Sequence, residues 1–143
     1  PSKQPFIHAD DIMPGTFIAA VGADSEDKQE LSSGLFSKSK IVDDLLEQSA
    51  AIGELHHALH QQQVTLADVY AELGMIISNK KQGRETNEEI IVFDSTGTAL
   101  QDVAAASIVY EKAVSNNIGI ELDFAEYGTV IRSGSGTSDS YRI

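Results

Sequence analysis

Thr16–Leu31 reads TFIAAVGADSEDKQEL, and this stretch decides the fold of the chain. It opens with a short apolar run over Thr16–Val21 that follows a Pro-Gly turn and is rich in residues typical of a buried strand. Gly22 ends this run, and a helical stretch follows. In an open α/β sheet, ligands bind beyond the carboxyl ends of the strands. Asp24 and Lys28, just past such an end, are therefore the first candidates for functional residues.

The pattern of an apolar run that ends in an acid occurs twice more, at Lys40–Asp44 (KIVDD) and at Glu89–Gly97 (EIIVFDSTG). Helical segments separate the three expected strands. Parallel neighbours need a crossover connection, which is usually a helix, so this alternation predicts an α/β fold with a mostly parallel sheet. Asp24, Asp44 and Asp94 all fall at or just after strand ends.

Helical periodicity is expected between and after these strands. Leu66–Ile77 has apolar residues at three-and-four spacing and follows Thr65, a residue type that caps helices, so it predicts one amphipathic helix. The longest helix is expected over Thr98–Ser115. The remaining expectations are a single turn within His8–Met13, short helices over Glu30–Lys38, Leu45–Ala51 and Glu54–His60, a short strand over Ile118–Phe124, and a loose tail over 128–143.

Composition and charge exclude several classes of partner. The 143 residues include 10 Lys and Arg against 22 Asp and Glu, which gives a formal net charge of −12. Nucleic-acid surfaces need clustered cations to displace counterions, so we expect no nucleic-acid partner. The absence of cysteine excludes disulfides and fits a cytoplasmic location. Without a secretory signal or an apolar run near about 20 residues, we expect no membrane partner.

Two local patterns resemble binding sites, but each favours a simpler interpretation. His56 and His60 lie four residues apart, which is the spacing of a zinc-binding pair. His57 stands where the usual metalloprotease pattern has glutamate, and no third ligand is evident, so we expect no metal site. The basic cluster Lys80–Arg84 follows a helical segment, whose C-terminal dipole favours cations. A solvated loop is the favoured interpretation there, and a phosphate contact is the alternative.

Further motifs follow in a fixed order along the chain. They are Gly53-Glu54-Leu55, Glu72-Leu73-Gly74, Lys80–Arg84 (KKQGR), Glu89–Gly97, Ala99–Asp102 (ALQD) and Val109–Ala113 (VYEKA). Together with VGAD and KQEL of the Thr16–Leu31 stretch, these motifs resemble the carboxyl-terminal part of the ornithine cyclodeaminase/mu-crystallin family over about residues 1–126. This resemblance implies the second half of a Rossmann-like parallel sheet with flanking helices, followed by a long helix and a short tail.

The resemblance implies an enzyme of two lobes that uses NAD(H) or NADP(H). Residues 1–96 would form the second half of its dinucleotide-binding lobe. Residues 97–127 would return to the lobe that binds substrate and dimerises, and 128–143 would be a flexible tail. Family activities include cyclising deamination of ornithine or lysine, reduction of cyclic imines such as pyrroline-2-carboxylate, and alanine dehydrogenation. They share hydride transfer at the α carbon, so the implied partners are a small amino acid or cyclic imine and a second copy in a homodimer.

The resemblance also implies roles for individual residues. Asp24 would be the general acid/base, because imine chemistry at a carbon that exchanges hydride also requires proton transfer. The alternative is that Asp24 serves only as an Asx turn or helix N-cap. The implied binding residues are Val21, Gly22, Ala23, Asp24, Lys28 and Ser95 for the cofactor and Thr96 for the substrate.

Two features set the chain apart from the family. Glu26-Asp27 stands where many members have Pro-Gly, which adds negative charge beside the proposed cofactor site. The resemblance also places the glycine-rich phosphate loop and the basic substrate-binding residues outside this chain, so we expect the chain alone to lack catalysis. Two alternatives remain, a non-catalytic ligand-binding protein and a fragment with a structural role.

Overall fold

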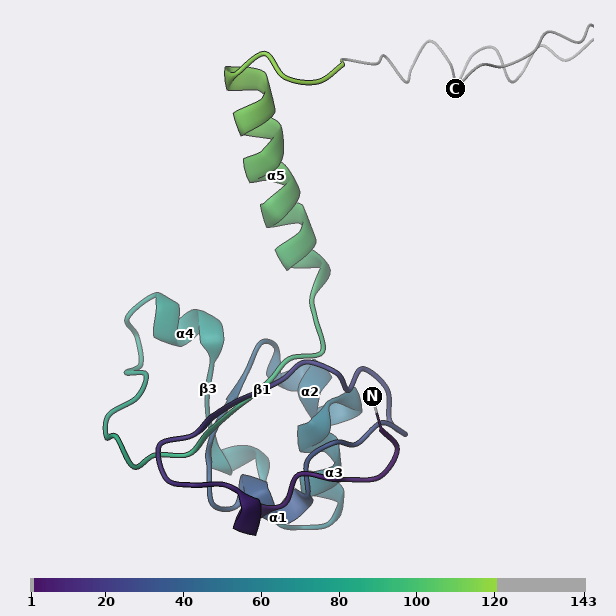
Figure 1. Ribbon diagram of the computed structural model, residues 1–143, viewed down its shortest axis with the longest axis vertical. Helices are drawn as coiled ribbons and strands as arrows, with labels where there is room; N and C mark the ends of the chain where they lie inside the picture. Colours follow the sequence, from purple (N-terminus) through teal and green to yellow (C-terminus); the bar gives the residue numbers. More distant parts are fainter. Residues whose placement is uncertain (1, 121–143) are drawn as a thin grey trace, which may run out of the picture. The chain divides into compact units, whose positions relative to one another are not determined.

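The computed structural model describes residues 2–120 (Figure 1), and the chain divides into two compact units, one up to Asp102 and one from Val103. The first unit contains a four-stranded parallel sheet. Three of its strands were predicted from their apolar runs, and the α/β fold is confirmed. In spatial order the strands are β1 (Phe17–Ala20), β4 (Ile91–Asp94), β2 (Lys40–Asp43) and β3 (Val69–Glu72).

The register of the sheet brings three strand ends level. Ala20 of β1 and Asp43 of β2 are both register partners of Asp94, the last residue of β4. The pairing continues one residue beyond β4, because the N–H of Ser95 donates to the carbonyl oxygen of Ala20 at 2.9 Å. The carboxyl ends that the sequence marks with acids therefore form one edge of the sheet.

Short helices cover one face of the sheet. The core combines alternate strand residues, such as Ile41 and Val92, with Leu35 and Phe36 of α1 and Leu55 of α3, all almost fully buried. Burial of these side chains is the main stabilising contribution of this unit. The helical elements are the 3-10 turns η1 (Ala9–Asp11) and η2 (Leu66–Asp68), and the helices α1 (Ser33–Phe36), α2 (Leu46–Ile52), α3 (Glu54–His60) and α4 (Leu73–Ile77).

The single helix predicted over Leu66–Ile77 is wrong. The chain forms η2, then the strand β3, and only then α4. Asp68 caps the start of η2, because its carboxylate accepts the N–H of Thr65, the N-cap residue, at 2.7 Å. The next residues pair with β2, and Ala71 is buried there. The predicted helical face is not buried, since Leu66 and Ile77 are 56% and 72% exposed.

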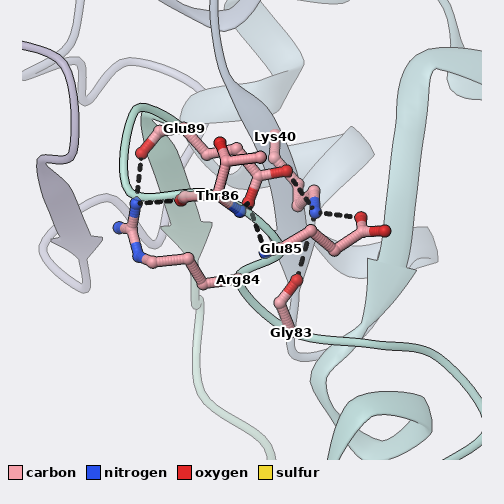
Figure 2. A network of polar contacts seen from close by, with 6 residues as sticks. All are labelled: Lys40, Gly83, Arg84, Glu85, Thr86 and Glu89. Atoms are coloured by element: carbon pink, nitrogen blue, oxygen red, sulfur yellow. Dashed lines mark hydrogen bonds and ion pairs between the residues drawn. The ribbon is translucent and has the colours of Figure 1, made fainter.

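Lys40 fixes the long connection between α4 and β4 (Figure 2). Its ammonium group donates to Glu85 at 2.6 Å and to the carbonyl oxygen of Gly83 at 3.1 Å, and it pairs with Glu89 at 2.7 Å. Arg84 of the basic cluster donates to the carbonyl oxygens of Thr86 and Glu89 within the same loop. These contacts lie at the amino end of β2, away from the edge that carries the acids.

The second face of the sheet carries an open apolar cavity of about 470 Å³, lined in part by Val42, Phe93 and Leu73. The tail predicted over 128–143 and most of the strand predicted over Ile118–Phe124 lie outside the described residues. The predicted long helix is confirmed as α5 (Ala99–Ser115). Within the described part of the chain, no helix is long and apolar enough to cross a membrane.

Candidate functional site

The candidate site lies along the carboxyl edge of the sheet. One part is the segment 21–32, which connects β1 to α1 and which we call the Asp24 loop. The other part follows β4 and contains Ser95 and Thr96. Since β1 and β4 are neighbours in the sheet, the structure brings these two predicted groups of residues to adjacent strand ends.

Asp24 and Lys28 form an ion pair with a hydrogen bond from the Lys28 ammonium group to Oδ1 of Asp24. The side chains are 58% and 30% exposed, so both reach solvent. The hydrogen bond and the charge of Lys28 lower the pKa of the Asp24 carboxyl. Asp24 is therefore an ionised carboxylate, next to a cation, that can accept a proton.

The interpretation of Asp24 as the N-cap of the following helix is wrong. That helix, α1, begins at Ser33, and Ser32 occupies its N-cap position. Asp24 lies eight residues earlier in an extended and turned segment. The Asp24 carboxylate therefore does not cap α1, whereas the Asx turn stays a prediction.

The three residues before Asp24 combine one exposed side chain with two small ones. Val21 is 67% exposed at the end of β1, whereas Ala23 is 1% exposed. A Cβ added to Gly22 would lie 3.0 Å from both carboxylate oxygens of Glu30, so a larger residue would require the Glu30 side chain to shift slightly. The segment therefore presents one apolar side chain and little other bulk next to Asp24.

Ser95 and Thr96 present two hydroxyl groups at the end of β4. The Ser95 hydroxyl donates to Asp44 at 2.7 Å, and the same carboxylate oxygen accepts the N–H of Gly97 at 3.0 Å. The Thr96 hydroxyl is buried and has no hydrogen-bond partner among the described residues. Buried polar groups are normally paired, so this hydroxyl has capacity for a further contact.

Two strand-end carboxyl groups, those of Asp43 and Asp94, are fully buried. Burial, strengthened by the charges of Asp94, Asp44 and Glu72, raises the pKa of Asp43 to about 8. Burial also raises the pKa of Asp94 to about 7, although the N–H groups of Leu55 and Glu54 favour its charged form. The sequence placed Asp94 at a strand end, but it gave no signal for the burial of either carboxyl group.

A buried glutamate, Glu54, is a further residue whose part in the site the sequence did not reveal. It is 1% exposed, and its carboxylate accepts two backbone N–H groups of the Asp24 loop. The sequence marked it only as part of the Gly53-Glu54-Leu55 motif. A polar residue at the start of a helix usually faces solvent, so burial could not be predicted from its position.

The histidine and lysine patterns have structural contacts of their own. The rings of His56 and His60 stack with centroids 6.3 Å apart. Lys81 of the basic cluster lies over the ring of Tyr70, 4.7 Å from its centroid. Across the described residues, no three or more His, Cys, Asp or Glu side chains converge in a way that could hold a metal ion.

The model of the ornithine cyclodeaminase/mu-crystallin family matches residues 1–117. The chain belongs to this family. It is 46% identical over 124 residues to an alanine dehydrogenase of Archaeoglobus fulgidus, an alignment that covers 87% of this chain and 38% of that protein. The chain thus spans less than two-fifths of the length of this relative.

Solved structures agree with this assignment. An archaeal alanine dehydrogenase dimer with bound NAD matches with a TM-score of 0.79 and 46% identity, over 86% of this chain and 38% of that one. The pyrroline-2-carboxylate reductase of Thermococcus litoralis, in complex with NADH and L-proline, also has a TM-score of 0.79. It is 32% identical over 85% of this chain and 38% of that one. The neighbouring structures thus contain NAD or NADH in related folds.

Proposed function

We propose that this chain is the carboxyl-terminal part of a nicotinamide-dependent enzyme that transfers hydride at the α carbon of an amino acid or cyclic imine. The observation that carries the proposal is that Asp24 and Lys28 follow β1 while Ser95 and Thr96 follow β4, its neighbour in the sheet. This is the edge of an α/β sheet at which ligands bind. The relatives named above, a dehydrogenase and a reductase, have the same class of chemistry.

The residues at this edge suit a nicotinamide cofactor. Val21 offers an exposed apolar side chain for contact with a flat ring, and the small residues Gly22 and Ala23 leave room beside it. We propose that these residues, together with Asp24, Lys28 and Ser95, bind the cofactor. When bound, a nicotinamide ring supplies or accepts the hydride.

Asp24 is the proposed general acid/base. Interconversion of an amino acid and its imine or keto acid requires a proton to move to or from nitrogen or water beside the reacting carbon. The Lys28 ammonium group keeps Asp24 ionised, so that its carboxylate accepts this proton and later returns it. The Thr96 hydroxyl, whose hydrogen-bonding capacity is unused among the described residues, is the proposed contact to substrate.

Several finer features belong to the same proposal. We propose that the complete protein is a homodimer, since a related alanine dehydrogenase is a dimer, and that it is cytoplasmic. The boundary at residue 97 between the dinucleotide-binding lobe and the connection to a second lobe is likewise proposed. Sedimentation of the complete protein and cell fractionation would test the first two.

The test is an assay of the full-length protein with NAD(H) and NADP(H), followed by nicotinamide absorbance and by ammonia release, because cyclising deamination of ornithine or lysine leaves no net change in the cofactor. The panel consists of L-alanine, L-proline, L-ornithine and L-lysine in the oxidative direction, and pyruvate with ammonia and pyrroline-2-carboxylate in the reductive direction. We expect turnover of at least one substrate with one cofactor. Tight binding of cofactor or substrate with no turnover across the panel would instead indicate the non-catalytic binding protein.

A further inference from the structure

One buried side chain holds the Asp24 loop from the interior of the fold. Oε1 of Glu54 accepts the N–H of Glu30 at 2.7 Å, and Oε2 accepts the N–H of Leu31 at 3.0 Å. Glu54 and Leu31 are 1% and 2% exposed, so water does not compete for these bonds. Burial raises the pKa of the Glu54 carboxyl, whereas the two N–H groups favour its charged form. Glu54 therefore restrains the end of the loop nearest to α1.

A second side chain of α3 holds the same loop three residues after Glu54. Nε2 of His57 lies 2.8 Å from the carbonyl oxygen of Lys28. Because a carbonyl oxygen only accepts, this contact requires the proton on Nε2. The helix thus contacts Lys28, Glu30 and Leu31 through their backbone, and Lys28 is the residue whose side chain pairs with Asp24.

The start of α3 is in turn fixed by the end of β4. Oδ2 of Asp94 accepts the N–H of Leu55 at 2.7 Å. A Cβ at Gly53 would lie 2.6 Å from the same oxygen, so only glycine permits this approach without a shift. Asp94 directly precedes Ser95, and a continuous set of contacts therefore links the strand end that carries Ser95 to the Asp24 loop.

The segment before η1 also holds the loop through its backbone. The N–H groups of Phe6 and Ile7 donate to the carbonyl oxygen of Glu30 at 3.0 and 3.1 Å, and the N–H of Ser32 donates to the carbonyl oxygen of Ile7 at 2.9 Å. The N–H groups of Glu30 and Leu31 take no part in these contacts and donate to Glu54 instead.

We propose that Glu54 is a positioning residue, which holds the Asp24 loop so that Lys28 stays paired with Asp24 at the strand ends. This inference rests on the proposed role of Asp24. The charged group that faces Asp24 is the Lys28 ammonium group, and the carboxyl groups that interact electrostatically with Glu54 are those of Glu30 and Asp94. Glu54 does not touch substrate or cofactor in this account. It acts through the backbone of the loop.

The first test compares Glu54→Gln with Glu47→Gln in the full-length protein. Glutamine offers one oxygen to the two N–H groups of Glu30 and Leu31, and its own NH₂ group repels the second, so the loop loosens. Glu47 is an exposed carboxylate of α2 and serves as the matched control.

In Glu54→Gln we expect kcat to fall about tenfold. The acidic limb of the pH–rate profile should move up by about half a pH unit. In the loosened loop the Lys28 ammonium group lies beside Asp24 for less of the time, so it lowers the pKa of Asp24 less. The control Glu47→Gln should match wild type in kcat and in the position of the acidic limb. A merely structural role would lower the amount of active enzyme and leave the limb in place, and that result would overturn the proposal.

The second test does not depend on the role of Asp24. Amide hydrogen exchange should accelerate about tenfold or more at Glu30 and Leu31 in Glu54→Gln, with no change along β4. Unchanged exchange at both amides, or equal acceleration in β4, would overturn the proposal. If Asp24→Asn retains the acidic limb, the proposed function fails, and hydrogen exchange still decides the role of Glu54.

His57→Ala provides a second variant if Glu54→Gln does not fold. It removes the contact to the Lys28 carbonyl oxygen without disturbing a buried charge, and His57 is only partly buried. We expect the same upward movement of the acidic limb at a smaller size. An unchanged limb and unchanged exchange over 28–31 in a folded His57→Ala variant would count against positioning by α3.

Discussion

Asp24 is the residue on which the proposed chemistry depends, and one conservative substitution tests it. Asp24→Asn keeps the size of the side chain but removes the carboxylate that accepts the proton. We expect kcat of the full-length protein to fall by about a hundredfold or more. The thermal midpoint should change little, because the ion pair with Lys28 is largely exposed. Steady-state rates measured alongside thermal unfolding provide both values.

The control for Asp24 is Glu26→Gln, which removes an exposed carboxylate from the same loop. It should keep wild-type kcat. An Asp24→Asn enzyme with wild-type turnover would remove Asp24 from the mechanism. Because Asp24 is not a helix cap, preserved activity could not be attributed to the good capping ability of asparagine.

Asp43 should make the stability of the chain fall as the pH rises. Its pKa is about 8 in the folded state against 3.8 ordinarily. Between these values the folded state binds more protons than the unfolded state, so the free energy of unfolding decreases with pH. Asp43→Asn should flatten this slope by about 1 kcal/mol per pH unit between about pH 5 and pH 7.

Urea unfolding of wild type, Asp43→Asn and the exposed control Glu47→Gln over this pH range measures the slopes. Asp94, whose pKa is also raised, contributes a fall of the same sign in all three proteins. Parallel slopes for wild type and Asp43→Asn would show that Asp43 is ionised in the folded state. A flatter slope in Glu47→Gln would show that the change is not specific to the buried group.

For single residues, the sequence predicts which acids lie at the strand ends but not which of them are buried. The acids at strand ends followed from the repeated pattern of apolar run and acid, because parallel strands share one carboxyl edge. Burial of Asp43 and Glu54 depends on the neighbouring strands and on α3, and these contacts join residues far apart in the chain. No local sequence pattern indicates these long-range contacts.

Among the elements, β3 shows why the sequence-based prediction failed where it did. The apolar residues of Leu66–Ile77 match helical spacing, yet Val69 and Tyr70 are also strong strand formers. Pairing with β2 decides in favour of the strand, since a partner already in the sheet satisfies the backbone of Val69–Glu72. By contrast, α2, α3 and α5 were predicted to within a residue or two at most ends, because no competing strand pattern overlaps them.

The connection between α4 and β4 should depend on Lys40. Lys40→Met removes the cation that contacts Gly83, Glu85 and Glu89, and leaves the two carboxylates near one another. We expect the loop to open more often, so that trypsin cleavage after Lys80, Lys81 or Arg84 is about tenfold faster.

Lys38→Met is the matched control for Lys40, because Lys38 forms only an exposed ion pair, with Asp10 at 3.3 Å. Its cleavage pattern should equal that of wild type, apart from the lost site at residue 38. Mass spectrometry of early tryptic fragments distinguishes the variants. Equal cleavage of the loop in Lys40→Met and wild type would show that other contacts suffice to fix this segment.

For the whole molecule, the chain spans 38% of the length of the alanine dehydrogenase it resembles. The Asp24 loop contains four acidic residues, Asp24, Glu26, Asp27 and Glu30, and the first three lie in its first half near the proposed cofactor site. Pyrophosphate normally rests on glycine-loop amides at a helix N-terminus. We therefore expect the 143-residue chain alone to bind NAD(H) and NADP(H) at least about a hundredfold more weakly than the full-length protein.

Titration calorimetry of both proteins with each cofactor measures this difference. A cofactor affinity of the chain that equals that of the full-length protein would show that these 143 residues hold the dinucleotide by themselves. The same titrations also decide between NAD and NADP.

The central claim is hydride transfer at the α carbon, and isotope transfer in the full-length protein tests it most directly. The amino acid that the assay panel identifies is supplied with deuterium at its α carbon, and the nicotinamide product is analysed by mass spectrometry. If the amino acid is oxidised, the account predicts one deuterium in each reduced nicotinamide. If ornithine or lysine is cyclised, the hydride returns to the ring, so the account predicts a deuterated cyclic product and one deuterium in the nicotinamide trapped within a single turnover. Deuterium lost to water, deuterium that never appears in the nicotinamide, or no reaction of any amino acid or imine in the panel would contradict it.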